Sequence, residues 1–226
     1  SKVSPGCANC YAEALTKRYA GRPGWPAEFL PWTPENAAEN VVLHPDRLDA
    51  PLRWRKPRRV FVNSMSDLFH ENVPDEFIDR VFAVMSATPR HTYQVLTKRP
   101  ERMLRYLTER GDEQAETHAL YDEISGARFR IERYAAEYEA ADLDEPLEWR
   151  EEGDPLEWPR HNVWLGVSVE NQHWADLRIP LLLQTPAAVR FVSAEPLLGP
   201  VDLVDPFPCD EGKGPMGEWD YLGHPY

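Results

Sequence analysis

The chain has 226 residues, 42% of them hydrophobic and 28% charged, with a formal net charge of −13 at pH 7. That length can bury one substantial core, and three cysteines in a chain of this size argue against a disulfide-stapled secreted domain. No apolar run approaches the roughly 20 residues that cross a bilayer, and no signal-peptide pattern is visible. We therefore expect a cytoplasmic protein without a membrane partner.

The negative charge is concentrated in one segment. Residues 109–157 hold 17 Asp and Glu against five Arg, which leaves 21 acids against 20 bases elsewhere. The acidity therefore belongs to an insert. The near-neutral remainder neither excludes nor favours a nucleic-acid partner.

Two cysteines stand three positions apart near the start of the sequence, just ahead of a helix-forming run. Cys7 and Cys10 could form half of a zinc site, a redox dithiol or part of an iron–sulfur ligand set; two structural thiols are a fourth reading. Cys209 and seven scattered His are the other candidate ligands, and none of them forms a second close pair. The pattern alone leaves these alternatives open.

Outside the insert, the sequence alternates strand and helix patterns. Short apolar segments that end in polar residues predict four strands, at 58–67, 92–97, 162–169 and 189–194. Apolar stripes predict a helix over 75–87 opened by Pro74, a helix from Pro100 to Gly111, and a short helical stretch broken or restarted at Pro180. This alternation predicts an α/β fold with a parallel sheet of βα repeats, either open or closed into a barrel.

The insert divides the predicted domain. We expect a first part of the βα domain with the cysteine motif at 1–108, an acidic and mostly helical insert at 109–160, the continuation of the domain at 161–204, and a Pro/Gly-rich tail at 205–226. Apolar residues at helical spacing support the helical insert: Leu120, Ile124, Ala127, Ile131, Tyr134 and Tyr138.

Polar residues follow each predicted strand. They are Asn63, Ser64, Ser66 and Asp67, then Thr97, Lys98 and Arg99, then Ser168, Glu170 and Asn171, and finally Ser193 and Glu195. The carboxyl ends of parallel strands meet on one side, where active sites form. Any one of these residues could simply cap a turn, but the recurrence after four strands favours a site. Separately, the basic run 53–59 could lie along phosphates or be a solvated loop.

Five segments carry a resemblance to a known family: Val3–Glu13, Val60–His70, Val95–Met103, Val163–Gln172 and Phe191–Gly199. They resemble the successive motifs of the bacterial and phage three-cysteine-motif family, whose members are usually labelled only as phage proteins of unknown function. The resemblance covers most of the chain except the acidic insert and the C-terminal tail. It implies similarity to radical S-adenosylmethionine enzymes, and hence a partial (β/α) barrel, to which the helical acidic insert predicted above is added.

The resemblance also implies cofactors and ligands. Cys7 and Cys10 match the second and third cysteines of the motif, and the first would lie just before Ser1, so we expect a chain truncated at both ends. Three such cysteines would hold a 4Fe–4S cluster, whose open iron would bind S-adenosylmethionine. Ser66, Lys98, Glu170 and Glu195 would hold polar groups of that cofactor.

The expected function is thus a radical S-adenosylmethionine-type enzyme with an unknown substrate. A nucleic acid or nucleotide is suggested by the phage setting of the family and by the basic run. Two alternatives remain: a non-catalytic metal- or nucleic-acid-binding module that works with a partner protein, and a zinc-dependent hydrolase.

Overall fold

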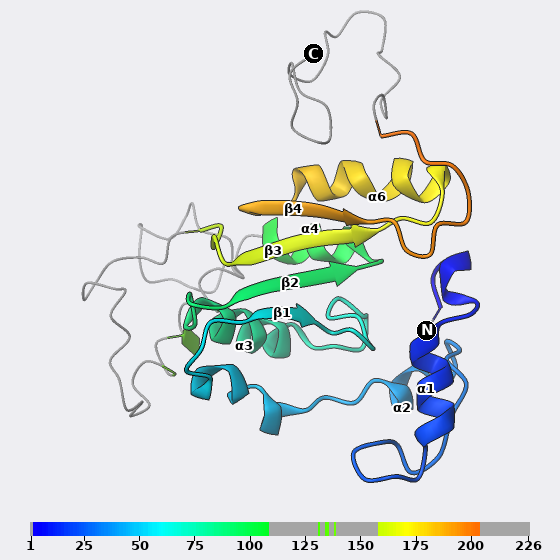
Figure 1. The fold of residues 1–226 in the computed structure, drawn as a ribbon, viewed down its shortest axis with the longest axis horizontal. Coiled ribbons are helices and arrows are strands. Elements are labelled where there is room, and N and C mark those ends of the chain that lie inside the picture. Colours follow the sequence, from blue (N-terminus) through cyan, green and yellow to red (C-terminus); the bar gives the residue numbers. More distant parts are fainter. Residues whose placement is uncertain (1, 109–130, 132–133, 136–137, 139–157, 204–226) are drawn as a thin grey trace, which may run out of the picture.

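The computed structural model describes residues 2–108, 131, 134–135, 138 and 158–203, and every structural statement below concerns these residues. Their centre is a parallel sheet of four strands, which are β1 (Arg59–Val62), β2 (Thr92–Thr97), β3 (Val163–Ser168) and β4 (Val189–Ser193). The strands lie in chain order, β1-β2-β3-β4, with every neighbouring pair parallel (Figure 1). The predicted parallel α/β fold is confirmed. Closure into a barrel is neither shown nor excluded.

Three helices of the described residues follow strands β1, β2 and β3 along the chain. These are α3 (Asp75–Ser86), α4 (Pro100–Thr108) and α6 (Gln172–Gln184). Pro74 caps α3 with an extended backbone, as expected of a residue whose φ is fixed and which has no N–H to leave unpaired. The prediction that the third helix breaks at Pro180 was wrong, because α6 continues through that residue to Gln184. Residues buried on either side of the proline, Ala175 and Leu182, hold the two turns against the core.

The first predicted strand also ends earlier than expected. Strand β1 stops at Val62 because Asn63 takes a left-handed backbone with φ of 63°, a conformation that asparagine tolerates better than most residues. Residues 63–65 therefore form a turn, with a bend at residue 66. This turn places Asp67 beside the end of β2, since the Thr97 hydroxyl donates to it at 2.7 Å.

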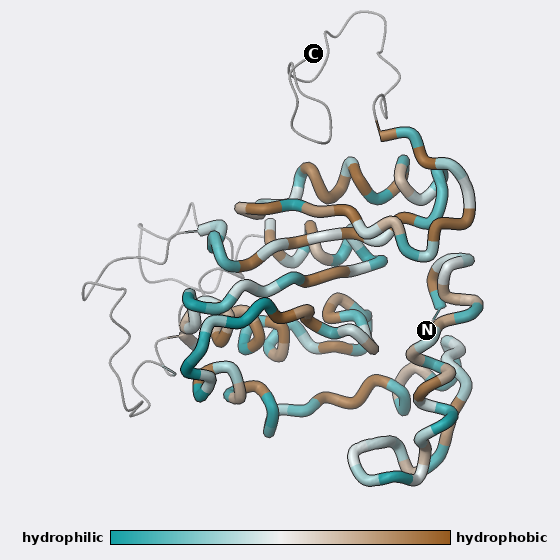
Figure 2. The backbone as a smooth tube through the Cα atoms, in the orientation of Figure 1, coloured by the Kyte–Doolittle hydropathy of each residue, from teal (hydrophilic) through white to brown (hydrophobic). Residues whose placement is uncertain are grey.

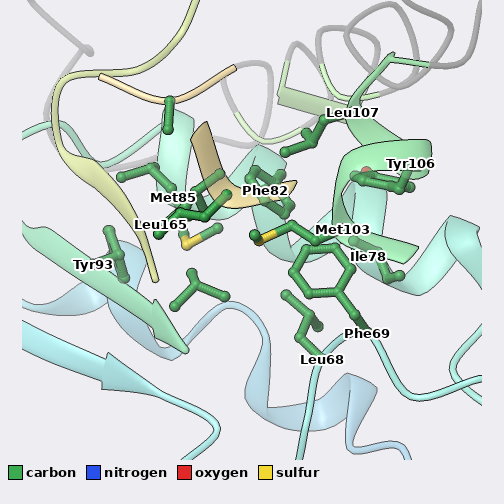
Figure 3. Packing of buried hydrophobic residues seen from close by; sticks show 14 of the residues in the cluster. Leu68, Phe69, Ile78, Phe82, Met85, Tyr93, Met103, Tyr106, Leu107 and Leu165 are labelled. Atoms are coloured by element: carbon green, nitrogen blue, oxygen red, sulfur yellow. The ribbon is translucent and has the colours of Figure 1, made fainter. Parts of the chain in front are cut away.

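The core lies between the sheet and its helices. Alternate strand residues such as Tyr93, Val95 and Leu165 are at most 2% exposed, and they pack with helix residues such as Phe82 and Met103 (Figure 3). Burying a side chain of this size contributes about 1.5–3 kcal/mol. Figure 2 shows hydrophobic residues along the strands and over most of α6, whereas the segment leading into β1 is largely hydrophilic.

Part of the acidic insert joins this core. Ile131, Tyr134 and Ala135 are helical and buried within the same hydrophobic cluster, and Tyr138 packs against it. The rest of the predicted insert and the tail at 205–226 lie outside the described residues.

The segment before β1 contains short helices. They are η1 (Pro5–Cys7), α1 (Tyr11–Tyr19), α2 (Ala37–Asn40), η2 (Pro45–Arg47) and η3 (Ala50–Arg53). Figure 1 shows η1 and α1 on the side of the sheet to which all four strand arrows point. The cysteine motif thus lies at the carboxyl edge of the sheet. None of the helices in the described part of the chain is long and apolar enough to span a membrane.

Candidate functional site

The two cysteines lie in a tight turn that leads into α1. The Cys7 N–H donates to the Ser4 carbonyl and the Ala8 N–H to the Pro5 carbonyl, both at 2.9 Å, which closes η1. Cys10 is the N-cap of α1 and has an extended backbone. Both side chains are half-buried free thiols. We call residues Ser4–Cys10 the cysteine turn.

Beneath this turn lies a buried carboxylate, that of Glu170, two residues beyond the end of β3. Its side chain is fully buried. Oε1 accepts hydrogen bonds from the Ser4 hydroxyl at 2.5 Å and from the Lys98 ammonium, while Oε2 accepts from Nη1 of Arg178 at 3.0 Å. One carboxylate therefore connects the cysteine turn, the end of β2 and helix α6.

The cysteine turn approaches Glu170 so closely that only glycine fits at position 6. A Cβ on Gly6 would lie 2.6 Å from Cγ of Glu170 and 2.7 Å from its Oε1. These distances are shorter than real Cβ contacts, so a side chain there would force the turn or the carboxylate to move.

The Cys7 thiol has an environment that favours its ionised form. Burial by itself raises the pKa of the thiol, but hydrogen bonds from the backbone at Val3 and Ser4 oppose it, together with the positive charge of Lys98. The net effect lowers the pKa of Cys7 below its usual value. Because the thiolate is the form that ligates metals, Cys7 is suited to bind one.

Arg178 is the residue that sequence reasoning missed. It is 1% exposed on α6, and its Nη1 donates to the Ser168 carbonyl at 2.6 Å as well as to Glu170. Its guanidinium lies over the Trp174 ring, 4.2 Å from the ring centroid. Burial lowers the pKa of Arg178, while the neighbouring Glu170 carboxylate opposes that effect. A signal was present in the sequence, since position 178 lies on the same helical face as the apolar residues 175 and 182.

Asp67 has a structural role at the same edge. Its Oδ1 accepts from the Phe69 N–H at 3.0 Å and the Thr97 hydroxyl at 2.7 Å. Oδ2 accepts from the Lys98 N–H at 3.1 Å and from Nη1 of Arg99 at 3.0 Å. The carboxylate thereby fastens the turn after β1 to the end of β2 and fixes the backbone that carries Lys98.

The structure brings together two of the four residues that we expected to bind a cofactor. Lys98 and Glu170 are in direct contact, and the Lys98 ammonium also donates to the Ser168 hydroxyl at 3.1 Å. Ser66 is exposed in the turn after β1, where its N–H donates to the Asn63 carbonyl. Glu195 is exposed beyond β4, and its carbonyl accepts from Ser168 at 3.1 Å.

The described residues supply only a partial metal ligand set. Among them, no group of three or more His, Cys, Asp and Glu could hold a metal ion. Cys209, the third cysteine of the sequence, lies outside the described residues.

The basic run lies at the other end of the strands from the cysteine turn. Arg59 is the first residue of β1, and the Arg58 guanidinium lies over the Trp54 ring, 4.6 Å from its centroid. This segment is thus at the amino edge of the sheet.

Comparison with protein-family models gives one match, to the family described as "Protein of unknown function (DUF5131)", over residues 1–210. The chain belongs to this family. The DUF5131 description names no activity, cofactor or source, so the similarity to radical enzymes and the phage setting stay predictions. The match spans the cysteine turn, all four strands and the acidic insert. No curated protein and no solved structure matches the chain.

Proposed function

We propose that this DUF5131 chain is an iron–sulfur enzyme of the radical S-adenosylmethionine type, with Cys7 and Cys10 as two of the cluster ligands. The observation that carries the proposal is the position of the cysteine turn. It lies on the carboxyl edge of a parallel sheet, where α/β enzymes form their active sites, and it contacts a buried charged network there.

The donor set fits an iron–sulfur cluster in part. Clusters are held by cysteine thiolates, and the lowered pKa of Cys7 favours the thiolate. When bound, the cluster would supply the electron that cleaves the sulfonium of S-adenosylmethionine. A cluster with one open iron needs three cysteines, so the proposal requires a third ligand from outside the described residues.

The surrounding residues would position the cluster and its cofactor. Lys98 sets a positive charge near Cys7, which offsets part of the negative charge that thiolates bring into a half-buried site. The Lys98 side chain is 22% exposed, so one side of it can meet a bound ligand. Ser66 and Glu195 are exposed and can offer a hydroxyl and a carboxylate to the polar groups of the cofactor.

The proposal includes a nucleic acid or nucleotide as the class of substrate and names no specific one. The basic run is at the amino edge of the sheet, so it would contact phosphates on the opposite edge from the cysteine turn. A partner protein is likewise a prediction without a defined surface.

Reductive cleavage of S-adenosylmethionine tests the proposal. The chain would be extended upstream to restore the expected cysteine, reconstituted anaerobically with iron and sulfide, reduced with dithionite and assayed for 5′-deoxyadenosine. We expect product from this protein and none from its Cys7→Ser variant, while the Cys209→Ser variant retains activity. No product from a protein that does carry a cluster would favour the binding-module alternative.

A further inference from the structure

One buried side chain, that of Glu170, contacts the Ser4 end of the cysteine turn. Four residues contact Glu170. The Ser4 hydroxyl donates to it at 2.5 Å, Gly6 lies so close that a Cβ would not fit, and Arg178 and Lys98 donate hydrogen bonds to the carboxylate. The Cys10 end of the turn has a different anchor, since the Tyr11 hydroxyl donates to the Ser64 carbonyl at 2.6 Å.

We propose that Glu170 is a positioning residue that sets the place of Cys7 through its contacts with Ser4 and Gly6. It was expected to bind the cofactor directly. Its two oxygens instead accept hydrogen bonds from three protein donors, and its side chain is fully buried. This inference rests on the proposed function, because the position of Cys7 has a functional consequence only if its thiol is a cluster ligand.

The carboxylate is itself held rigidly, which a positioning residue requires. Arg178 contributes a planar guanidinium that is fixed by the Ser168 carbonyl on its edge and by Trp174 on its face. The hydrogen bond that this guanidinium donates to Glu170 is charge-assisted, and such bonds are stronger than those between neutral groups. Helix α6 therefore fixes the position of Glu170, and Glu170 in turn fixes the position of the cysteine turn.

Gly6 offers the cleanest perturbation. Gly6→Ala removes no charge and no hydrogen-bonding group, yet its methyl group overlaps Glu170. Glu170→Asp withdraws the carboxylate by one methylene, which breaks the Ser4 contact but makes room for that methyl group. If both residues act through the same contact, the double variant should behave like Glu170→Asp alone.

Hydrogen exchange of the metal-free chain measures directly how firmly the cysteine turn is held. The Cys7 and Ala8 amides close the turn, and we expect their protection factors to fall about tenfold in Gly6→Ala and in Glu170→Asp, the effect of losing one charge-assisted hydrogen bond. Adding Gly6→Ala to Glu170→Asp should then change them by less than about twofold. Additive losses would overturn the proposal, as would unchanged protection in Gly6→Ala.

A matched control separates this from general destabilisation. Gly166→Ala introduces the same kind of overlap, with a Cβ 2.6 Å from the Phe191 ring, but does so within the sheet. We expect it to lower stability and leave the Cys7 and Ala8 amides protected; a tenfold loss at these amides would contradict the proposal.

Should Gly6→Ala fail to fold, Ser4→Ala removes the hydrogen bond to Glu170 without adding bulk. In that variant the Cys7 and Ala8 amides should lose protection to the same extent. Unchanged protection in Ser4→Ala would overturn the positioning role. Since the assay uses metal-free protein, the positioning role of Glu170 can be refuted while the cluster proposal stands. The cluster proposal can equally be refuted while the positioning role stands.

Discussion

The buried charges around Glu170 make a quantitative prediction about stability. Glu170→Gln keeps the shape of the side chain and removes its charge. Arg178 is then left as a cation that is 1% exposed, without the carboxylate 3.0 Å from its Nη1. Breaking a buried ion pair on one side costs about 3–5 kcal/mol. Lys98 adds less, because its side chain is 22% exposed and can turn toward water.

The assay is urea unfolding followed by circular dichroism. With an m-value of about 2 kcal/mol/M, a loss of about 4 kcal/mol lowers the midpoint by about 2 M. Glu76→Gln is the matched control, since Glu76 and Arg80 also lie 3.0 Å apart but with side chains 64% and 42% exposed. An exposed pair of this type contributes about 0.3–0.5 kcal/mol, so its midpoint should hardly move.

A second variant tests the cause of the loss. Replacing both partners, in Glu170→Gln with Arg178→Met, removes the unpaired charge and should recover part of the stability lost in Glu170→Gln alone. The reasoning is refuted if Glu170→Gln costs less than about 1 kcal/mol. It is also refuted if the double variant is less stable than the Glu170→Gln single variant.

Other parts of the molecule give further predictions. Tyr106→Phe removes a hydroxyl that donates at 2.7 Å to the fully buried Asp79, and should cost about 1.5–3 kcal/mol in the free energy of unfolding; a loss below about 0.5 kcal/mol would show that another donor satisfies Asp79. Gly166→Ala should lower the free energy of unfolding by about 1–3 kcal/mol, because its methyl group overlaps Phe191. Adding Phe191→Leu should relieve this overlap, and a double variant no more stable than Gly166→Ala alone would contradict that explanation. Burial, with the charge of a nearby arginine, lowers the pKa of His70 to about 4. Because the unfolded chain binds the proton more readily, the contribution of His70 to the free energy of unfolding should be fully present above pH 6.5. It should fall by up to about 3 kcal/mol as the pH drops toward 4, and His70→Asn should flatten this pH dependence.

Much of the sheet could be predicted from local patterns. Strands β2 and β4 begin at the predicted residues, because short apolar segments bounded by polar residues are favoured as strands. The end of β1 could not be predicted, since it depends on the backbone conformation that Asn63 adopts. The prediction that Pro180 interrupts α6 was wrong, since the helix continues through it. Burial of the surrounding residues outweighs the tendency of proline to break a helix.

The candidate site could be predicted in its location but not in its connections. Polar residues after parallel strands must meet at one edge, which is why Lys98 and Glu170 were identified together. The hydrogen bond between Ser4 and Glu170 spans 166 residues of sequence. The position of Arg178 on an apolar helical face indicates burial but does not identify its partner. Local periodicity carries no information about such pairings.

Metal content after anaerobic reconstitution tests the central claim most directly, that the cysteine turn binds an iron–sulfur cluster. Iron, sulfide and zinc would be measured on the upstream-extended chain, on its Cys7→Ser and Cys10→Ser variants, and on Cys209→Ser as the control. The account predicts about four irons and four sulfides per chain in the parent and in Cys209→Ser, and a large loss in the other two. Zinc in place of iron, or equal iron in all four proteins, would contradict it.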